Sequence, residues 1–211
     1  MEICPLCYTK SFQPEIEGPQ GRRLYLCENC KLVFEKRINR PERDVEKDRY
    51  LEHDNSINDK GYVQHLNRAI KPVLNYLKPD YQGLDYGCGP VPTLNRLLEK
   101  ESYNCEFYDP IFFPEPPTGK FDFIFATECF EHFFRPADEM CKLSGLLKPE
   151  GILVVMTQPW KDTTKFKSWR YATDPTHVVF YNLETIEFIS RNYGFTLLKN
   201  YRDRVFILQK K

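Results

Sequence analysis

Four cysteines near the start of the chain have the residue type and spacing of a metal site. They form two Cys-x-x-Cys pairs, CPLC and CENC, separated by residues 8–26. Two such pairs supply four thiolates, the ligand set of a structural zinc ion with no open position for catalysis. We therefore expect zinc at Cys4, Cys7, Cys27 and Cys30. Two disulfides, a redox pair or an iron site are the alternatives.

The segment that carries these cysteines is too short to bury a core of its own, so metal binding would supply its stability. Pro5 and Asn29 suit a tight turn inside each pair, and GPQGRR suits the turn of a small hairpin between the pairs. We predict a zinc ribbon over residues 1–35. A charged linker or solvated helix over residues 36–60 and a main domain over residues 61–211 follow it.

The second chemical feature is the stretch LDYGCGPVP, residues 84–92, in which a short apolar strand runs into closely spaced glycines. Such a turn lets the backbone approach a ligand closely. Gly87 and Gly89 are present, but the third glycine of the nucleotide-binding fingerprint is missing. Asp85 lies in the strand, and Asp109 follows about 20 residues beyond the turn, where an acid can accept hydrogen bonds from ribose hydroxyls.

Alternating strand and helix patterns surround these residues. Apolar residues recur at helical spacing over residues 61–79, with Pro72 as a potential kink. Asn182 and Gly194 suit the start and end of a later helix. The alternation predicts a parallel sheet with helices on both faces and a final antiparallel hairpin. We expect strands at 83–86, 104–109, 121–128 and 151–159, helices at 92–101, 137–147 and 182–194, and the hairpin at 195–209.

Four segments in this order resemble class I S-adenosylmethionine-dependent methyltransferases. Asp85, Gly87 and Gly89 match the family's [DE]xGxGxG motif, with Val91 in place of its third glycine. FDFIFATECFEHF resembles its fourth-strand segment, and LLKPEGILVVMTQP resembles the helix, turn and strand that follow. The final hairpin resembles its antiparallel seventh strand. The resemblance covers residues 60–211 and implies a Rossmann-like sheet that binds S-adenosylmethionine and transfers its methyl group.

The resemblance also implies a role for each matching residue. Asp85 would orient the methionine amine, the glycine turn would pass the methionine tail, and Asp109 would hold the ribose. A capping role for Asp85 and a small-residue role for Cys88 in the bend are the alternatives. The cofactor site implied in this way comprises Asp85, Tyr86, Gly87, Cys88, Gly89, Asp109, Pro110, Thr127 and Glu128.

One part of the family's pattern is absent. Only PIFFPEPPTGK separates Asp109 from the fourth-strand segment, where the family usually has a further helix and strand. Its prolines and glycine exclude a helix, so we expect the sheet to be one βα unit short at that edge. The family's adenine-contacting acid is missing too. Ile111, Phe112 or Phe113 would pack on the adenine instead, or would only cover the shortened edge.

A long aromatic segment without periodicity, residues 158–182, follows the last parallel strand. Ligands of open α/β sheets bind at this end of the strands, and loops carry function disproportionately. We therefore expect this segment to form the acceptor pocket. The predicted acceptor contacts are Trp169, Tyr171, Asp174 and Tyr181.

Three side chains are candidates for catalysis. An O–H or N–H acceptor must lose a proton, and His177 suits that task because imidazole titrates near neutral pH. Glu131 and His132, at the end of the fourth-strand segment, could also reach the acceptor. The structural alternatives are that His177 pairs with Asp174 to hold its loop and that Glu131 and His132 cap the next helix. We assign His53 to the surface.

Composition narrows the choice of partners. The chain has 30 basic and 30 acidic side chains, so no overall charge attracts nucleic acid or anionic lipid. It shows neither an apolar run of membrane-spanning length nor the pattern of a signal peptide. We expect a cytoplasmic protein that does not bind membranes, and the sequence leaves its oligomeric state open.

Three functions compete. The favoured one is methyl transfer to an unidentified small molecule, with the ribbon as a lid or docking platform. The second is an rRNA or tRNA methyltransferase whose ribbon docks RNA, for which Arg22, Arg23 and Lys31 would supply a small basic patch. The third is a non-catalytic binding protein with the same fold. Binding of S-adenosylmethionine separates the third from the others, and salt-dependent retention on RNA identifies the second.

Overall fold

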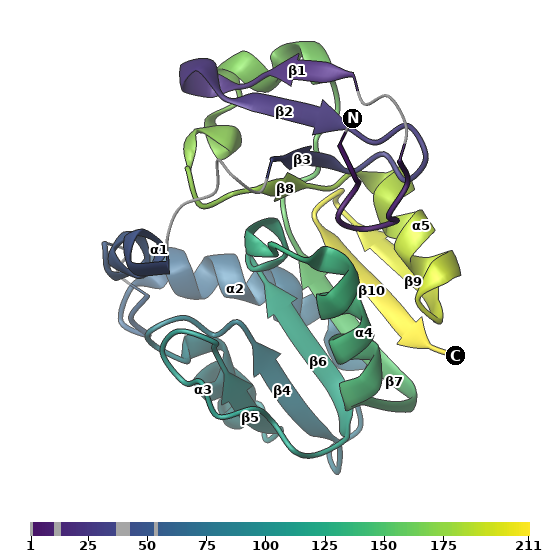
Figure 1. The fold of residues 1–211 in the computed structure, drawn as a ribbon. Helices are drawn as coiled ribbons and strands as arrows, with labels where there is room; N and C mark the ends of the chain where they lie inside the picture. Colours follow the sequence, from purple (N-terminus) through teal and green to yellow (C-terminus); the bar gives the residue numbers. More distant parts are fainter. Residues whose placement is uncertain (1, 11–13, 37–42, 53–54) are drawn as a thin grey trace.

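Two β-sheets organise the molecule, and the smaller one lies across one end of the larger (Figure 1). The computed structural model describes residues 2–10, 14–36, 43–52 and 55–211. The large sheet has six strands in the order β5-β4-β6-β7-β10-β9, and the small sheet has four in the order β1-β2-β3-β8. Within the described part of the chain, no helix is both long and apolar enough to cross a membrane.

The large sheet consists of four parallel strands and a hairpin. The parallel strands are β4 (Gln82–Tyr86), β5 (Asn104–Tyr108), β6 (Phe121–Thr127) and β7 (Leu147–Met156). The hairpin consists of β9 (Phe195–Tyr201) and β10 (Val205–Lys210), and β10 runs antiparallel to β7. The predicted α/β sheet with a final antiparallel hairpin is confirmed.

The edge of the sheet beside β5 is one strand short, as predicted. Residues 109–120 join β5 directly to β6 without a helix or a strand. This segment folds back so that the backbones of Asp109 and Phe113 form a bridge. The ring of Phe113 packs edge-on against Phe107 of β5, with the ring centroids 4.9 Å apart. Phe113 therefore covers the shortened edge.

Helices cover both faces of the large sheet, because successive side chains of a buried strand point to opposite sides. The helices are α2 (Lys60–Val73), α3 (Thr93–Lys100), α4 (Pro136–Leu146) and α5 (Leu183–Asn192). Phe123 and Val154 share a core with α2 and α3. Ile124 and Val155 share the opposite core with α4 and α5.

Local sequence sets the ends of these helices. The Asp59 carboxylate caps α2 by accepting hydrogen bonds from two backbone N–H groups of its first turn. Pro72 lies in the last turn of α2, and a 3-10 turn over Leu74–Tyr76 follows. Asn182 caps α5, and Gly194 ends it with a φ of +78°. The predicted cap and stop of α5 are confirmed.

The N-terminal cysteine segment forms a sheet with a strand of the main domain. β1 (Glu15–Glu17), β2 (Arg23–Leu26) and β3 (Val33–Glu35) are antiparallel, and a 3-10 turn over Pro19–Gly21 makes the predicted hairpin turn. β3 also pairs with β8 (Val179–Phe180), which belongs to the aromatic segment. Residues more than a hundred positions apart in the chain therefore share one small sheet.

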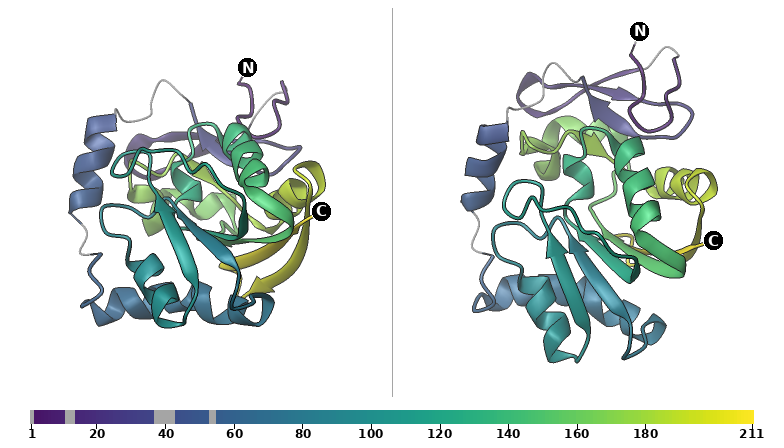
Figure 2. Two further views of the ribbon diagram at one scale, coloured as in Figure 1. Left: turned by 90° about the horizontal axis from the view of Figure 1, so that it is seen from below. Right: turned by 60° about the horizontal axis from the view of Figure 1, so that its bottom comes forward.

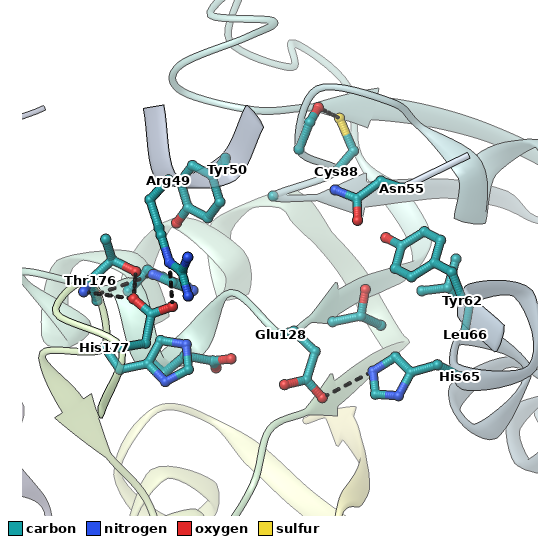
Figure 3. A pocket seen from close by; sticks show the side chains of 16 residues that line it. Arg49, Tyr50, Asn55, Tyr62, His65, Leu66, Cys88, Glu128, Thr176 and His177 are labelled. Carbon is teal, nitrogen blue, oxygen red and sulfur yellow. Dashed lines mark hydrogen bonds and ion pairs between the residues drawn. The ribbon is translucent and has the colours of Figure 1, made fainter. Parts of the chain in front are cut away.

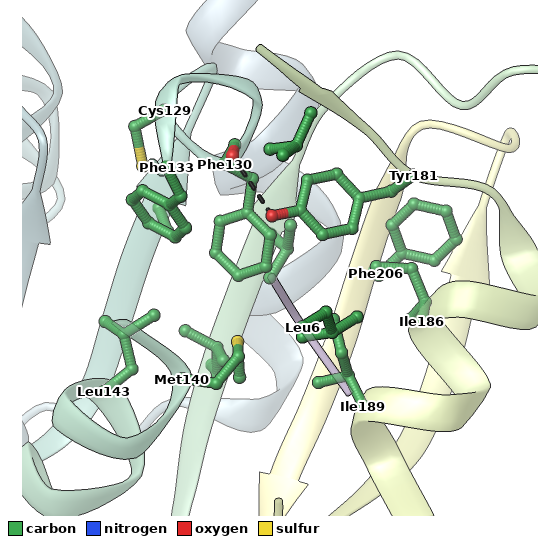
Figure 4. Close-up of a cluster of buried hydrophobic side chains, with 14 of the residues drawn as sticks. Leu6, Cys129, Phe130, Phe133, Met140, Leu143, Tyr181, Ile186, Ile189 and Phe206 are labelled. Atoms are coloured by element: carbon green, nitrogen blue, oxygen red, sulfur yellow. Dashed lines mark hydrogen bonds between the residues drawn. The ribbon is translucent and has the colours of Figure 1, made fainter. Parts of the chain in front are cut away.

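Side chains of the cysteine segment also enter the core of the main domain (Figure 4). Leu6 is fully buried in the same cluster as Phe130, Tyr181 and Ile189. The hydroxyl of Tyr193, just after α5, donates a hydrogen bond to the carbonyl of Leu6. The ribbon and the main domain therefore share one hydrophobic core, which explains how so short a segment is packed.

The charged segment contains a helix, α1 (Arg43–Leu51), which stands between the small sheet and α2 (Figure 2). Its Arg49 forms an ion pair with Asp174, and its Tyr50 packs edge-on against His132. These contacts make α1 part of the site described below. His53, assigned to the surface from the sequence, lies outside the described residues.

Candidate active site

Two adjoining cavities lie at the carboxyl ends of β4, β5 and β6. The larger, which we call the β5 cavity, measures about 430 Å³ and is lined by Tyr108, Asp109 and Ile111, among others. The smaller, which we call the histidine pocket, measures about 180 Å³ and is lined by His65 and His177, among others. The residues that line both are Tyr50, Gly87, Gly89, Glu128 and His132.

The glycine turn after β4 lies between the two cavities. Gly87 has a φ of +80° and Gly89 a φ of +68°, conformations that L side chains rarely adopt. A Cβ on Gly87 would lie 2.7 Å from the Cβ of Cys129, so no side chain fits there. The Oδ2 of Asp109 accepts a hydrogen bond of 3.0 Å from the N–H of Gly89. The backbone conformation of the two glycines and the carboxylate of Asp109 thus fix the turn.

Asp109 also organises the loop that follows β5. Its Oδ1 accepts hydrogen bonds from the N–H groups of Ile111 and Phe112, at 2.8 and 3.0 Å. Each carboxylate oxygen has two lone pairs, so Oδ2 of Asp109 can accept one further hydrogen bond from a ligand in the β5 cavity, which Asp109 lines. Of the three apolar candidates, Ile111 lines this cavity, whereas Phe112 packs edge-on against Tyr50.

Asp85 is buried beneath the turn, with 2% of its surface exposed, and it is not among the residues that line either cavity. Its Oδ1 has no hydrogen-bond partner within the described residues. Burial, and then the charge of Asp109, raises the pKa of this carboxyl to about 7. Such an unpartnered acid suits a cationic ligand group reached through a water molecule.

The other predicted cofactor residues line one cavity or both. Burial, with the charges of Asp85 and Asp109, raises the pKa of the Cys88 thiol. Cys88 is therefore a protonated side chain in a bend and not a nucleophile. These lining residues are Tyr86, Pro110, Cys88, Thr127 and Glu128.

Glu128 lies in the middle of the histidine pocket, with His65 on one side and His177 on the other (Figure 3). It follows β6 with a φ of +49°, a strained conformation for a residue with a side chain. Its Oε1 lies 3.3 Å both from Nε2 of His65 and from Nη2 of Arg204. Its Oε2 accepts a hydrogen bond from the Tyr171 hydroxyl at 3.2 Å. Burial alone would raise the pKa of Glu128, but His65 and Arg204 lower it, so the carboxylate is charged.

The three predicted catalytic residues converge on the same pocket. One carboxylate oxygen of Glu131 and one ring nitrogen each of His132 and His177 lie within 4.8 Å of one another. The Oε2 of Glu131 accepts a hydrogen bond of 3.0 Å from Thr157, whereas its Oε1 is buried and has no partner within the described residues. Burial, and then the charge of Glu128, raises the pKa of Glu131 to about 8.

Backbone carbonyls orient both imidazoles. Nδ1 of His132 donates to the carbonyl of Thr176 at 3.1 Å, and Nδ1 of His177 donates to that of Tyr171 at 2.7 Å. Because a carbonyl only accepts, Nδ1 carries the proton in each ring and Nε2 carries the lone pair. Burial lowers the pKa of both rings, to about 3 for His132, so both are neutral near pH 7.

The structural roles that the sequence suggested for His177, Glu131 and His132 differ from the contacts that these side chains make. His177 holds its loop through the carbonyl of Tyr171 and not through the carboxylate of Asp174. Glu131 and His132 do not cap α4, because they lie in a 3-10 turn and the cap position of α4 is Arg135, which makes no side-chain cap.

Two of the four predicted acceptor contacts lie at the histidine pocket. Asp174 lines it and pairs with Arg49, with 3.1 Å between Oδ2 and Nε. Tyr171 lies behind the lining, where its hydroxyl is hydrogen-bonded to Glu128 and within 3.2 Å of the Thr157 hydroxyl. Tyr171 therefore helps to position Glu128, an acid that lines the pocket.

The other two predicted acceptor contacts, Tyr181 and Trp169, do not line the histidine pocket. Tyr181 is fully buried in the main core, where its hydroxyl donates to the carbonyl of Phe130 (Figure 4). Trp169 packs edge-on against Phe166 and lines a different hollow beside Trp160. Aromatic side chains of this segment fill cores on both sides of β8, and sequence composition alone does not separate such residues from pocket residues.

A second set of pocket residues was missed by the sequence analysis, because residues 36–60 were treated as a linker and residues 61–79 only as an apolar helix face. The recurrence of Tyr62, His65 and Leu66 at helical spacing, with a histidine beside the apolar face, was the available signal. These missed residues come from α1, from α2 and from the chain between them: Arg49, Tyr50, Asn55, Tyr62, His65 and Leu66.

Arg22 connects the ribbon to the histidine pocket. Its guanidinium pairs with the buried Glu35 carboxylate at 2.7 Å, and the Arg22 side chain is 12% exposed. It also donates hydrogen bonds of 2.6–2.8 Å to three backbone carbonyls within residues 172–177. This corrects the predicted basic patch of Arg22, Arg23 and Lys31, because Arg22 is used inside the protein.

The four N-terminal cysteines lie together and are not joined by disulfides. Their sulfur atoms are all within 4.8 Å of one another. Two of the sulfur pairs, Cys4 with Cys30 and Cys7 with Cys27, are 3.5 Å apart. Four sulfurs around zinc at about 2.3 Å would be spaced by roughly 3.8 Å, so the arrangement suits a tetrahedral ion.

Comparisons with known proteins agree with this geometry. A family model described as a methyltransferase domain matches residues 58–200. A solved O-methyltransferase family protein from Burkholderia thailandensis is 15% identical, with a TM-score of 0.53, over 79% of this chain and 62% of that one. The 1,6-didemethyltoxoflavin-N1-methyltransferase of the same organism is 13% identical, with a TM-score of 0.57, over 95% of this chain and 100% of that one.

A third structure, the magnesium protoporphyrin IX methyltransferase of Synechocystis PCC 6803, is 13% identical, with a TM-score of 0.53, over 80% of this chain and 94% of that one. No curated protein sequence matches the chain. At these identities the structures establish the fold, and the family match covers more than half of the chain. The chain therefore belongs to the methyltransferase-domain family and has the fold of class I S-adenosylmethionine-dependent methyltransferases.

Proposed function

We propose that this methyltransferase transfers the methyl group of S-adenosylmethionine to a small molecule held in the histidine pocket. The observation that carries the proposal is the shared lining of the two cavities, which includes Gly87, Glu128 and His132. A donor in the β5 cavity would face an acceptor in the histidine pocket across these residues. Two of the structural neighbours contain S-adenosylhomocysteine, which supports the same choice of donor.

The residues of the β5 cavity fit this donor. Asp109 has one lone pair left on Oδ2 for a ribose hydroxyl, and Ile111 offers an apolar surface for the adenine. Gly87 and Gly89 have positive φ angles and no side chains, so the backbone of the turn can approach the methionine tail closely. The unpartnered oxygen of Asp85 suits the methionine ammonium group, reached through water. Bound S-adenosylmethionine supplies an electrophilic methyl group, so the chain has to align the acceptor with it.

The size and charge of the histidine pocket favour a small acceptor over RNA. The pocket measures about 180 Å³, and Arg49 and Tyr50 of α1 reach into it from one side (Figure 3). Acidic residues line it, and its lining cation, Arg49, is paired with Asp174, so among the described residues of the lining no unpaired lysine or arginine is left for a phosphate backbone. RNA recognition requires a basic face with exposed aromatic rings, and the guanidinium of Arg22 is committed to the interior.

Label transfer tests this function. The full chain is incubated with methyl-labelled S-adenosylmethionine and either a small-molecule extract or total RNA. We expect label in the small-molecule fraction. Label in RNA would overturn the choice of acceptor, and salt-dependent retention on RNA would support that result. Calorimetry that detects no binding of the cofactor at millimolar concentration would overturn the transfer function itself.

We propose that Glu131, His132 and His177 act on the acceptor. They line the pocket together, and each imidazole has its lone pair on Nε2. The His177→Ala variant should lose turnover by a factor of about 100 or more while its affinity for S-adenosylmethionine stays the same. Near-normal turnover would show that His177 does not act on the acceptor.

We also propose that Cys4, Cys7, Cys27 and Cys30 bind one structural zinc ion. The support is the spacing of their sulfurs, together with the small size of the ribbon that surrounds them. Elemental analysis of the full chain should find about one zinc per chain at these ligands. A folded protein that lacks metal at this site would overturn the proposal.

A further inference from the structure

We propose that Glu131, His132 and His177 form a second metal site, which binds a divalent transition-metal ion facing the histidine pocket. The ion would hold the methyl acceptor by an oxygen atom. The metal site stands on the geometry of these three residues, whereas the role for the acceptor rests on the proposed function. Two imidazoles and one carboxylate, with the remaining positions open, form a ligand set that suits zinc and ferrous ions.

The donor atoms of the three side chains lie close together. One oxygen of Glu131 and one nitrogen each of His132 and His177 lie within 4.8 Å of one another. The two imidazole rings cross at 80°, with their centroids 4.8 Å apart. Metal–ligand bonds of about 2.0–2.2 Å place neighbouring donor atoms roughly 3.0–3.6 Å apart, so side-chain rotations that move the donor atoms by about 1 Å would complete the site.

The groups behind the three side chains orient them as metal ligands. A histidine ligand usually donates its second ring N–H to a backbone carbonyl, which leaves its other nitrogen to the metal. His132 and His177 both do this, through the carbonyls of Thr176 and Tyr171. Glu131 is held by the hydroxyl of Thr157 at one oxygen. Each candidate ligand thus has one atom anchored by the protein.

The second oxygen of Glu131 points to a cation independently of the distances between the donor atoms. Its Oε1 is buried without a hydrogen-bond partner in the described part of the chain, and the residue is 0% exposed. Burial keeps an isolated carboxyl neutral, whereas a coordinated cation would compensate the charge of its deprotonated form. The neighbouring carboxylates already have cations, since Glu128 pairs with Arg204 and Asp174 pairs with Arg49.

The charge of the occupied site defines the class of acceptor. With both histidines neutral, Glu131 contributes one negative charge, so a divalent ion leaves one net positive charge toward the pocket. This charge favours an acceptor with an acidic hydroxyl group, such as a phenol or an enol, because coordination lowers the pKa of a bound O–H group. His177 would then be a metal ligand, and it would not need to act as the base.

Cobalt titration tests the site in the full chain with zinc bound at the four cysteines. We expect about one equivalent of Co²⁺ to give visible d–d absorption without thiolate-to-cobalt charge transfer. His177→Gln and Glu131→Gln should each abolish this absorption. The His65→Gln variant is the matched control, because this residue lines the same pocket outside the three-residue cluster, and it should bind Co²⁺ as the wild type does.

X-ray absorption of the cobalt-loaded wild type keeps the test independent of whether the variants fold. A shell of nitrogen and oxygen with imidazole scattering supports the site, and a sulfur shell shows that cobalt has entered the cysteine site instead. Absence of Co²⁺ binding at millimolar concentration, or unchanged binding in both variants, would overturn the proposal. Because the titration needs no cofactor, its outcome is separate from that of S-adenosylmethionine binding, which tests the proposed function.

Discussion

The two sides of the site are held together in different ways. The β5 cavity depends on backbone geometry at neighbouring strand ends, with Gly87, Gly89 and Asp109 close together. The histidine pocket depends on side chains from α1, α2, the turn after β6 and residues 174–177. The ribbon fixes the last of these segments. We therefore expect changes to the ribbon to damage the acceptor side first, whereas changes to the turn should damage the cofactor side.

The largest effect should come from the glycine turn. Gly87→Val introduces a side chain at a φ of +80°, where its Cβ would lie 2.7 Å from the Cβ of Cys129. We expect the affinity for S-adenosylmethionine to fall by a factor of about 100 or more, because the turn must move. Isothermal calorimetry measures this loss.

Val91→Gly is the matched control on the same turn. Val91 replaces the family's third glycine, and adding a glycine there restores the motif without a clash. We expect cofactor affinity to stay within about threefold of wild type. Equal losses in Gly87→Val and Val91→Gly would show that the turn has no special role at Gly87.

The cofactor side is readable from the sequence because its residues are close in the chain or have fixed spacing. Gly87, Gly89 and Asp109 were found in this way, and the short segment after β5 correctly predicted the missing strand. The acceptor side is not readable in this way, because its lining depends on how distant segments pack. Tyr181 and Tyr50 show the limit: one aromatic fills the core and the other lines the pocket, and neither has a local signal.

Loss of the zinc site that we propose at the four cysteines should separate the two sides. The ribbon pairs with β8 and contributes Leu6 to the main core. Unfolding of the ribbon would therefore release residues 174–177, which line the histidine pocket. We expect Cys27→Ser to lower the melting temperature by about 10 °C and to abolish turnover, while cofactor affinity changes by less than about tenfold. Equal loss of cofactor binding and of turnover would contradict the separation.

A smaller effect should come from the contact that joins the ribbon to the pocket. Arg22→Ala removes the guanidinium that pairs with the buried Glu35 carboxylate and frees three carbonyls within residues 172–177. We expect the free energy of unfolding to fall by about 3–5 kcal/mol, as measured by urea denaturation.

Arg23→Ala tests whether this effect depends on position. Arg23 is adjacent in the sequence, but its side chain is 71% exposed and, among the residues that the structure describes, it forms an ion pair with Glu15 alone, at 3.5 Å. We expect a change within about 0.5 kcal/mol. Similar losses in Arg22→Ala and Arg23→Ala would mean that the buried contacts of Arg22 do not stabilise the ribbon.

The smallest effect should be a pH dependence of stability that arises from Asp85 on the cofactor side. The pKa of Asp85 is about 7 in the folded protein, above the ordinary value of 3.8. A raised pKa favours the neutral carboxyl in the folded state, so its stabilising contribution is present below about pH 4 and is lost as the pH rises through 7. Asp85→Asn removes this ionisation. The stability of the cofactor-free wild type relative to Asp85→Asn should therefore fall by about 2 kcal/mol between about pH 5.5 and 7.5.

The same comparison with saturating S-adenosylmethionine sharpens the role of Asp85. If the methionine ammonium pairs with this carboxylate through water, the bound state stabilises the charged form, and the pH dependence of the difference should shrink. Urea denaturation at several pH values, with and without cofactor, measures both slopes. Parallel stability curves for wild type and Asp85→Asn without cofactor would show that Asp85 ionises normally, and its buried oxygen would then have another partner.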